Sequence, residues 1–360
     1  MGLCSTATVS SIALACKLVL NLPGFAKVSV SGLHIFLDAL RSDARQHGHG
    51  VITVANHIST LDDPVAWGVI PAHCYFRERT TRWALGASDI MFTNPLFSAF
   101  FRQGQVLETF RGRGIYQPAV DTAIEKLNGG AWVRCASLLG TRATLFAVSN
   151  AGPVLPLRRR YCGVKLNHIS PQVHLFGEGK INQPNTYPVV NGVAHLPRFK
   201  WGVGRILMET QRPPTVIPMW LSGFDQLMPE GRAFPYKYLP RPGARLSVTF
   251  GTPLPQDSIR HALDILHDGS TLGRQVAYDD RYITRDPKTS VLPPEGEHAK
   301  GWVGGDVADS AGDSGSDRVY DELRNVGVAR VRSEVTAIVQ RAVEDLGRRV
   351  SGNLLGSGQR

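Results

Sequence analysis

The stretch of the chain most suited to chemistry is NHISTLDD, residues 56–63, which directly follows the apolar run VITVA at 51–55. His57 and Asp62 lie five positions apart. On a regular helix this spacing separates two side chains by about 140°, so a wholly helical stretch would not bring them together. A strand that ends before His57, then a loop, then a helix that begins at Asp62 beside Pro64 would bring the two side chains together.

In that arrangement the carboxylate of Asp62 accepts a hydrogen bond from one ring nitrogen of His57, and the other nitrogen takes a proton from a hydroxyl group. The chemistry that this pair predicts is general-base catalysis of acyl transfer without a covalent enzyme intermediate. The chain contains 11 histidines, and a single histidine is more often an ordinary surface or core residue. The spacing alone therefore leaves both interpretations open.

The string HxxxxD resembles the first motif of the glycerolipid acyltransferase superfamily, and the longer run NHISTLDDPVAWG is similar to its cardiolipin-remodelling transacylases. Similar runs follow in the same order and extend the resemblance over about residues 50–255: RWALGASDIMFTN at 82–94, FFRQGQVLETFRGRGIYQ at 100–117, IEKLNGGAWV at 124–133, FGEGKIN at 176–182, RFKWGVGRILME at 198–209 and PMWLSGFDQLMP at 218–229. The resemblance implies an acyltransferase-like α/β domain, a mixed β-sheet flanked by helices.

The second motif of the superfamily falls on Phe110, Arg111 and Gly112. The resemblance implies that Arg111 and Gly112 bind substrate, since a guanidinium can hold a lipid phosphate with two hydrogen bonds. The alternative is a solvated surface arginine.

The third motif, usually FPEG, falls on residues 176–179. The resemblance implies that Glu178 hydrogen-bonds a glycerol hydroxyl and that Gly179 lets the backbone approach the head group closely. Gly177 replaces the usual proline, which loosens this turn. The fourth motif falls on Pro218, which is expected to line the acyl-chain side. No metal and no cofactor are implied.

The charge balance is basic: 40 Lys and Arg against 30 Asp and Glu give a formal charge of +10 over 360 residues. Such a balance suits an anionic partner. Neither a nucleic-acid-binding motif nor interleaved aromatic residues accompany the charge, so no nucleic acid is expected as a partner. The five cysteines contain no CxxC pair, and neither a zinc site nor a disulfide framework is indicated.

Residues 133–172 interrupt the resemblance. They separate Trp132 from the strand-like VHLF at 173–176, which the superfamily joins directly, and they carry six Lys and Arg but no Asp or Glu. An insertion inside a strand that leads to a catalytic loop is costly, because loops tolerate insertions and paired strands do not. We interpret the segment as a retained intron translated in frame, or else as a loop specific to this chain. The basic residues of this segment do not support membrane binding by the rest of the chain.

The chain is expected to contain four parts. Residues 1–26 form a membrane-associated segment, in which the largely apolar stretch 9–22 is too short, at about 21 Å, to cross a bilayer and is predicted to lie in its surface or to be a core helix. Residues 27–267 form the acyltransferase domain, with strands predicted at 51–55, 173–176, 216–220 and 246–250 and a helix at 117–128. A disordered linker at 268–317 and a C-terminal helix and tail at 318–360, with the helix near 321–350, complete the chain.

The resemblance predicts a transacylase that remodels the acyl chains of cardiolipin and other phospholipids, with His57 as general base oriented by Asp62. Its partners are membrane phospholipids and lysophospholipids at a mitochondrial membrane surface, on the intermembrane-space face of the outer or inner membrane. A second membrane contact is considered at the apolar stretch 216–228, whose alternative is a core strand that runs into a loop. A CoA-dependent acyltransferase and an inactive membrane-associated homologue remain alternatives, and the oligomeric state is open.

Overall fold

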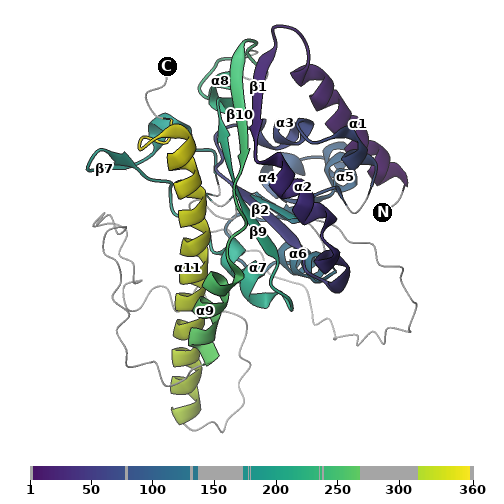
Figure 1. The fold of residues 1–360 in the computed structure, drawn as a ribbon. Helices are drawn as coiled ribbons and strands as arrows, with labels where there is room; N and C mark the ends of the chain where they lie inside the picture. The colour runs from purple at the N-terminus through teal and green to yellow at the C-terminus, as the bar shows by residue number, and fades with distance from the viewer. Residues whose placement is uncertain are drawn as a thin grey trace.

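The structure, a computed structural model, describes residues 3–77, 80–129, 133–136, 173–176, 178, 180–234, 236, 239–267 and 315–356. These residues form a mixed β-sheet with helices on both faces (Figure 1). The predicted α/β fold with a mixed sheet is therefore confirmed. The linker predicted at 268–317 lies outside the described residues up to residue 314.

The central sheet has eight strands within the described ranges, in the order β1-β10-β9-β2-β6-β5-β3-β4. Their bounds are β1 (Ala26–Ser31), β2 (Val51–Ala55), β3 (Trp83–Ala87), β4 (Val106–Thr109), β5 (Val133–Ala136), β6 (Val173–Phe176), β9 (Thr215–Ser222) and β10 (Ala244–Phe250). The strands from β9 to β4 run parallel to one another, whereas β10 is antiparallel to β9 and β1 is parallel to β10. A separate hairpin pairs β7 (Val189–Val190) with β8 (Val193–Ala194).

The helices cover both faces of this sheet. Their bounds are α1 (Leu3–Leu20), α2 (Leu33–Arg41), α3 (Asp62–Gly68), α4 (Ser88–Met91), α5 (Pro95–Gln103), α6 (Pro118–Asn128), α7 (Gly202–Glu209), α8 (Phe224–Leu227), α9 (Gln256–His267) and α11 (Gly315–Ser351), with single 3-10 turns η1 (Asp43–His47), η2 (Ala72–Phe76) and η4 (Pro184–Thr186). Phe250 of β10 stacks on Phe36 of α2 at 5.0 Å between ring centroids. Trp220 of β9 pairs with Thr249, the neighbour of Phe250 in β10. Successive strand residues point to opposite faces of a sheet, so Trp220 lies on the face opposite to Phe250, where it meets Gly347 of α11.

Helix α6 forms where the sequence predicts a helix. Pro118 occupies its first turn, where a missing N–H costs nothing, and Gly129 follows its last residue. Its buried residues are Ala119, Val120, Ala123, Ile124 and Leu127, a spacing that places one apolar stripe against the sheet.

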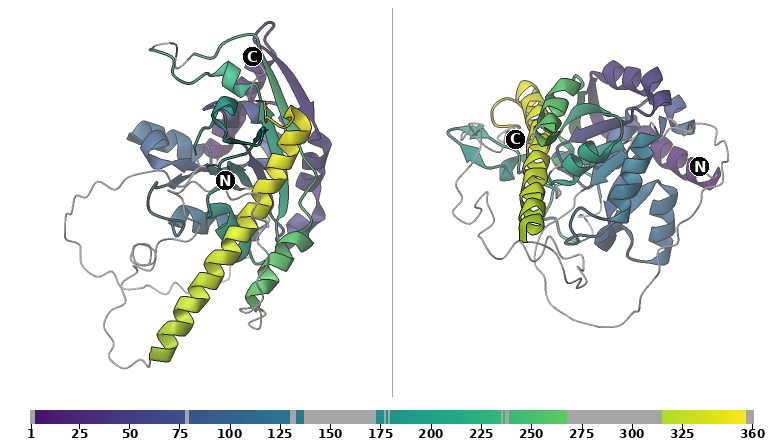
Figure 2. Two further views of the ribbon diagram at one scale, coloured as in Figure 1. Left: turned by 90° about the vertical axis from the view of Figure 1, so that its left-hand side faces the viewer. Right: turned by 90° about the horizontal axis from the view of Figure 1, so that it is seen from below.

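Helix α11 is longer than predicted and packs very closely on the sheet. It buries a row of apolar side chains: Val331, Val335, Val339, Val343 and Leu346. A Cβ atom at Gly347 would lie 2.5 Å from the Trp220 ring, and one at Gly204 of α7 would lie 2.6 Å from the carbonyl oxygen of Arg332. Both close approaches therefore require glycine. Figure 2 shows α11 running along the body with α9 beside it and extending past the sheet.

Helix α1 starts before the predicted apolar stretch 9–22, ends within it at Leu20, and packs on the domain. Ser10 donates to the carbonyl of Tyr75 at 2.8 Å, and Lys17 donates to the carbonyls of Gly68 and Ile70 at the end of α3. Leu14 and Leu18 on its outer side stay exposed, as does Leu22 just after the helix. Within the described ranges, the helices lack the combination of length and apolar character needed to cross a bilayer.

The prediction of a membrane contact at 216–228 is wrong, and the alternative of a core strand is correct. Trp220, Leu221, Phe224 and Leu227 are each at most 1% exposed. Strand β9 lies between β2 and β10, and α8 follows it. A central strand needs apolar residues on both sides, which produces the same run of apolar letters as an interfacial segment.

Candidate active site

The direction of the parallel strands gathers the predicted site residues at one edge of the sheet. His57 follows β2, Glu178 follows β6, and Arg111 follows β4. Asp89 lies in α4, which begins directly after β3. Because the carboxyl ends of parallel strands meet at the same edge, these four side chains come from neighbouring loops of the fold.

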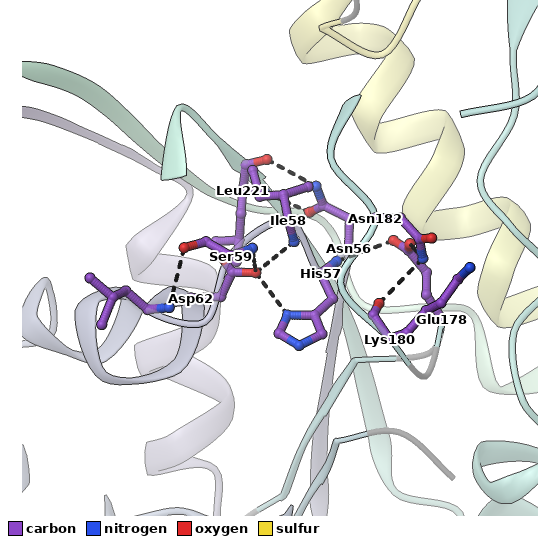
Figure 3. Close-up of polar contacts among 10 residues, drawn as sticks. Asn56, His57, Ile58, Ser59, Asp62, Glu178, Lys180, Asn182 and Leu221 are labelled. Atoms are coloured by element: carbon purple, nitrogen blue, oxygen red, sulfur yellow. Dashed lines mark hydrogen bonds and ion pairs between the residues drawn. The ribbon is translucent and has the colours of Figure 1, made fainter. Parts of the chain in front are cut away.

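The predicted contact between His57 and Asp62 is present. Nδ1 of His57 lies 2.9 Å from Oδ2 of Asp62, and the carboxylate is fully buried (Figure 3). The His57 side chain keeps 16% exposure. A carboxylate that accepts from Nδ1 fixes the tautomer in which Nε2 carries the lone pair, as a general base requires.

Backbone groups hold Asp62 in place independently of His57. Oδ2 also accepts the N–H groups of Ile58 and Ser59, at 2.7 and 2.9 Å. These donors belong to the loop between β2 and α3, and α3 begins at Asp62. The carboxylate therefore closes the loop on itself. The predicted strand at 51–55, the loop after it and the helix start at Asp62 are all present.

Asn56 ends strand β2 by imitating one more strand residue. Its side-chain amide donates to the carbonyl of Leu221 at 3.0 Å and accepts the N–H of Leu221 at 2.8 Å. The β2–β9 pairing is thus completed by a side chain, and the main chain can turn at His57. This buried asparagine was not among the predicted site residues, although it belongs to the string NHISTLDD.

Glu178 points into the protein, where it contacts the backbone of His57. Oε1 accepts the N–H of His57 at 3.1 Å, and Oε2 accepts the side-chain amide of Asn182 at 2.6 Å (Figure 3). Glu178 is 2% exposed. Burial raises its pKa to about 8, opposed by the hydrogen bonds from Asn182 and His57, and the nearby charge of Asp62 raises it further. The predicted neighbour Gly179, like Gly177, lies outside the described residues.

Arg111 lies in the loop after β4 and pairs with Asp89. Its guanidinium is 3.1 Å from the carboxylate of Asp89, and the two side chains are 35% and 55% exposed. Gly112 has a φ of 82°, a left-handed conformation that suits glycine. Arg113 lies over the ring of Phe110 at 4.6 Å. Two arginines thus stand in one turn at the edge where His57 lies.

Pro218 lies in the packed core. It pairs with Val54 in the β9–β2 register, and its carbonyl accepts the N–H of Gly251 at 2.8 Å. A Cβ atom at Gly251 would lie 2.9 Å from the Pro218 ring and 3.1 Å from Leu346 of α11. An acyl chain that reached Pro218 would have to enter between the sheet and α11.

Comparisons with known proteins agree with the resemblance. A family model described as Acyltransferase matches residues 27–222. A Drosophila melanogaster protein named Tafazzin is 31% identical over 210 residues, which are 58% of this chain and 42% of that protein. A Dictyostelium discoideum protein named Taffazin is 28% identical over 277 residues, 76% of this chain and 78% of that protein.

A third relative has a different name. An Arabidopsis thaliana protein named N-acylphosphatidylethanolamine synthase is 29% identical over 260 residues, which cover 71% of this chain and 72% of that protein. The chain thus spans less than half of the fly protein but most of the other two. The expected resemblance to a branch of the glycerolipid acyltransferases is confirmed, and the relatives that show it are tafazzins.

Proposed function

Because the chain belongs to the acyltransferase family, we propose that it moves a fatty acyl chain from a phospholipid to a lysophospholipid without CoA. The observation that carries this proposal is the His57–Asp62 pair, with the ring oriented by a buried carboxylate at the carboxyl edge of a parallel sheet. We propose cardiolipin and other phospholipids as substrates, in line with the resemblance described in the sequence analysis.

His57 acts as a base and then as an acid. Nε2 takes the proton of the free glycerol hydroxyl of the lysophospholipid, and the hydroxyl oxygen attacks the ester carbonyl of the donor. The tetrahedral intermediate collapses as the donor's glycerol oxygen leaves with the proton from Nε2. One ester bond forms and one breaks. Asp62 stabilises the transient imidazolium charge, which strengthens its hydrogen bond to Nδ1.

Arg111 provides the head-group contact in this proposal, with Gly112 leaving space beside it. A guanidinium can bind a phosphate oxygen pair with two hydrogen bonds. Arg111 exchanges Asp89 for the phosphate when a lipid binds. The partial exposure of both side chains supports this exchange, because a phosphate can approach without unpacking the core.

An apolar surface beside this loop supports access from a membrane. Four exposed apolar side chains stand on α4 and α5: Ile90, Leu96, Phe97 and Phe100, with Leu96 76% exposed. Helix α1, with its exposed leucines, contacts α5 through Ser5, which donates to the carbonyl of Gln103. We call the four side chains the α4–α5 surface. This surface suits shallow insertion into a bilayer. We propose mitochondrial membranes as the location, on the side that faces the intermembrane space.

The function is tested with purified protein and vesicles that contain labelled phosphatidylcholine and lysocardiolipin, without CoA. Label is expected in cardiolipin with wild-type protein and is expected to be absent with His57→Ala. If label moves only when acyl-CoA is supplied, the enzyme is a CoA-dependent acyltransferase. If wild type and His57→Ala transfer equally little under both conditions, the chain is an inactive homologue.

Membrane binding is tested separately by vesicle flotation. Leu96→Asp combined with Phe97→Asp is expected to reduce the bound fraction, because charged groups oppose insertion of the α4–α5 surface. Leu239→Asp, at an exposed leucine outside that surface, serves as the matched control. Equal binding of all three proteins would assign the membrane contact to another surface.

The Arabidopsis relative motivates a second candidate, acyl transfer to the amine of phosphatidylethanolamine. The base required is the same, since His57 would take a proton from the attacking amine. Vesicles that contain both phosphatidylethanolamine and lysophospholipid distinguish the two, because the label then appears in an amide or in an ester, which differ in their resistance to mild alkali.

A further inference from the structure

We propose that Asn182 is a positioning residue that acts with Glu178 to fix the backbone of His57. Glu178 is accordingly a support for the base rather than a contact of the glycerol hydroxyl. This inference rests on the proposed function for its kinetic test.

The two residues hold both backbone polar groups of His57. Glu178 accepts the N–H of His57 at 3.1 Å, and the backbone N–H of Asn182 donates to the carbonyl of His57 at 2.7 Å. The side chain of Asn182 then donates to Glu178 at 2.6 Å. These three bonds form a closed ring, so that no member can shift without stretching another (Figure 3).

Burial makes each hydrogen bond of this ring costly to lose. Glu178 is 2% exposed and Asn182 is 6% exposed. A buried carboxyl group that loses a donor is not compensated by water. The side chain of Asp62 fixes the His57 ring and the Glu178–Asn182 pair fixes its main chain, so the direction of Nε2 is set from two sides.

Asn182 has further local contacts that hold its side chain. Besides Glu178, its side-chain amide donates to the carbonyl of Lys180 at 3.2 Å. Farther along the chain, beyond η4 and the β7–β8 hairpin, α11 binds the backbone: Glu344 accepts the N–H of Leu196 at 2.9 Å and Gln340 accepts the N–H of Phe199 at 2.9 Å. The amide of Asn182 is thus oriented by two acceptors while its backbone N–H reaches His57.

A donor–acceptor exchange tests the pair. In Glu178→Gln, one side-chain oxygen is replaced by an NH2 donor, although both neighbours of this side chain also donate. In Asn182→Asp, two carboxyl groups face each other and the amide donor is lost. The double variant restores one donor and one acceptor with the direction of the hydrogen bond reversed. If Glu178 bound substrate as a carboxylate, this exchange would restore nothing.

The readouts are kcat and KM in the CoA-free assay. Each single variant is expected to lower kcat about tenfold or more with KM nearly unchanged, because orientation of the base rather than binding is lost. The double variant is expected to recover most of kcat. Asn185→Ala, at an exposed position of the same loop, is the matched control and is expected to behave as wild type. A double variant as slow as the product of the two single effects, or a rise in KM alone, contradicts the proposal.

A second measurement does not depend on activity. Amide hydrogen exchange at His57 is expected to be slow in wild type, faster in both single variants and slow again in the double variant. Asn182→Ser replaces the single variant if Asn182→Asp does not fold, and it too is expected to speed exchange. Unchanged exchange in folded single variants would disprove the positioning role. An inactive wild type with the expected exchange pattern would refute the proposed function alone.

Discussion

Nδ1 of His57 lies 2.9 Å from Oδ2 of Asp62, and that carboxylate is buried beneath the ring. The other oxygen, Oδ1, is buried without a hydrogen-bond partner in the part of the chain that the structure describes. All the described donors thus converge on one oxygen. Because of this asymmetry, replacing Asp62 by an amide of the same shape would still disturb its hydrogen bonds.

Asp62→Asn is expected to lower kcat by about 100-fold or more, because an amide does not stabilise the imidazolium. Its NH2 group would occupy the position of Oδ1 as an unpartnered buried donor, at a cost of about 1–3 kcal/mol in the free energy of unfolding. The CoA-free assay and urea unfolding measure the two effects. Asp38→Asn, whose side chain is 70% exposed, is the control that should change neither.

Glu178 makes stability depend on pH. Its pKa in the folded protein is about 8, above the ordinary 4.5, so the folded state holds a proton that the unfolded state releases. The resulting stabilisation is complete below pH 4.5 and is lost as pH rises through 8. Roughly 1.4 kcal/mol per pKa unit makes the loss on the order of a few kcal/mol. Unfolding titrations at a series of pH values should show a shallower decline in Glu178→Gln; parallel curves would contradict the assignment.

Asp89 competes with substrate for Arg111. Asp89→Asn is expected to lower KM for an anionic lysophospholipid about two- to fivefold, since an exposed ion pair is worth roughly 0.2–1 kcal/mol. Arg111→Ala is expected to raise that KM about tenfold or more. Both effects should shrink as salt is added. Arg102→Ala removes a comparable exposed pair, with Glu108 at 2.9 Å, and should leave KM unchanged; a similar rise there would indicate a general charge effect.

Helix α11 offers a matched pair of glycine substitutions. Gly347→Ala would place Cβ 2.5 Å from the Trp220 ring and is expected to destabilise the fold by about 1–3 kcal/mol. Gly327→Ala in the same helix meets nothing within 4 Å and is expected to stabilise the fold by about 0.5–1 kcal/mol, because alanine is the better helix former. Thermal unfolding should shift in opposite directions, and a shared direction would rule out the packing account.

Residues 133–172 can be deleted to test their origin. Val133 of β5 and Val173 of β6 both pair with Trp83 of β3, so the two strands begin at the same level of the sheet. A chain that joins Trp132 directly to Val173 would let β6 pair with β3 throughout. The deletion variant is expected to fold cooperatively and to be at least as active as the full chain. Messenger RNA that always retains the segment would exclude the intron interpretation.

The catalytic pair could be predicted from sequence because its geometry is local. A strand, a tight loop and a helix start follow from the residues between 51 and 64, and Asp62 needs no distant partner to reach His57. The roles of Glu178 and Asn182 could not be predicted in the same way, because their contact with His57 joins residues 121 positions apart. The strings NHISTLDD, RWALGASDIM and FGEGKIN contain Asn56, Asp89 and Asn182, but a string does not indicate which way a side chain points.

The fold was predicted best where an element has one apolar face or is apolar throughout. Helix α6 has one buried face and strand β2 is buried along its whole length, whereas β1 has five exposed residues and gives no such signal. The start of α1 was missed because it contains polar residues such as Ser5, whose side chain donates to a backbone carbonyl of α5. Burial of residues 216–228 depends on the neighbours of β9, which only the sheet order reveals.

The bond between Glu344 and the N–H of Leu196 links positions 148 residues apart. On a ribosome, the loop before α7 is therefore synthesised long before the helix that holds it. Closing so long a loop is slow compared with forming local helices. The His57–Asp62 loop can acquire its shape early, because its contacts are local, whereas the backbone at residues 196–199 is anchored only after α11 has been synthesised, so we expect this part of the domain to order late in folding.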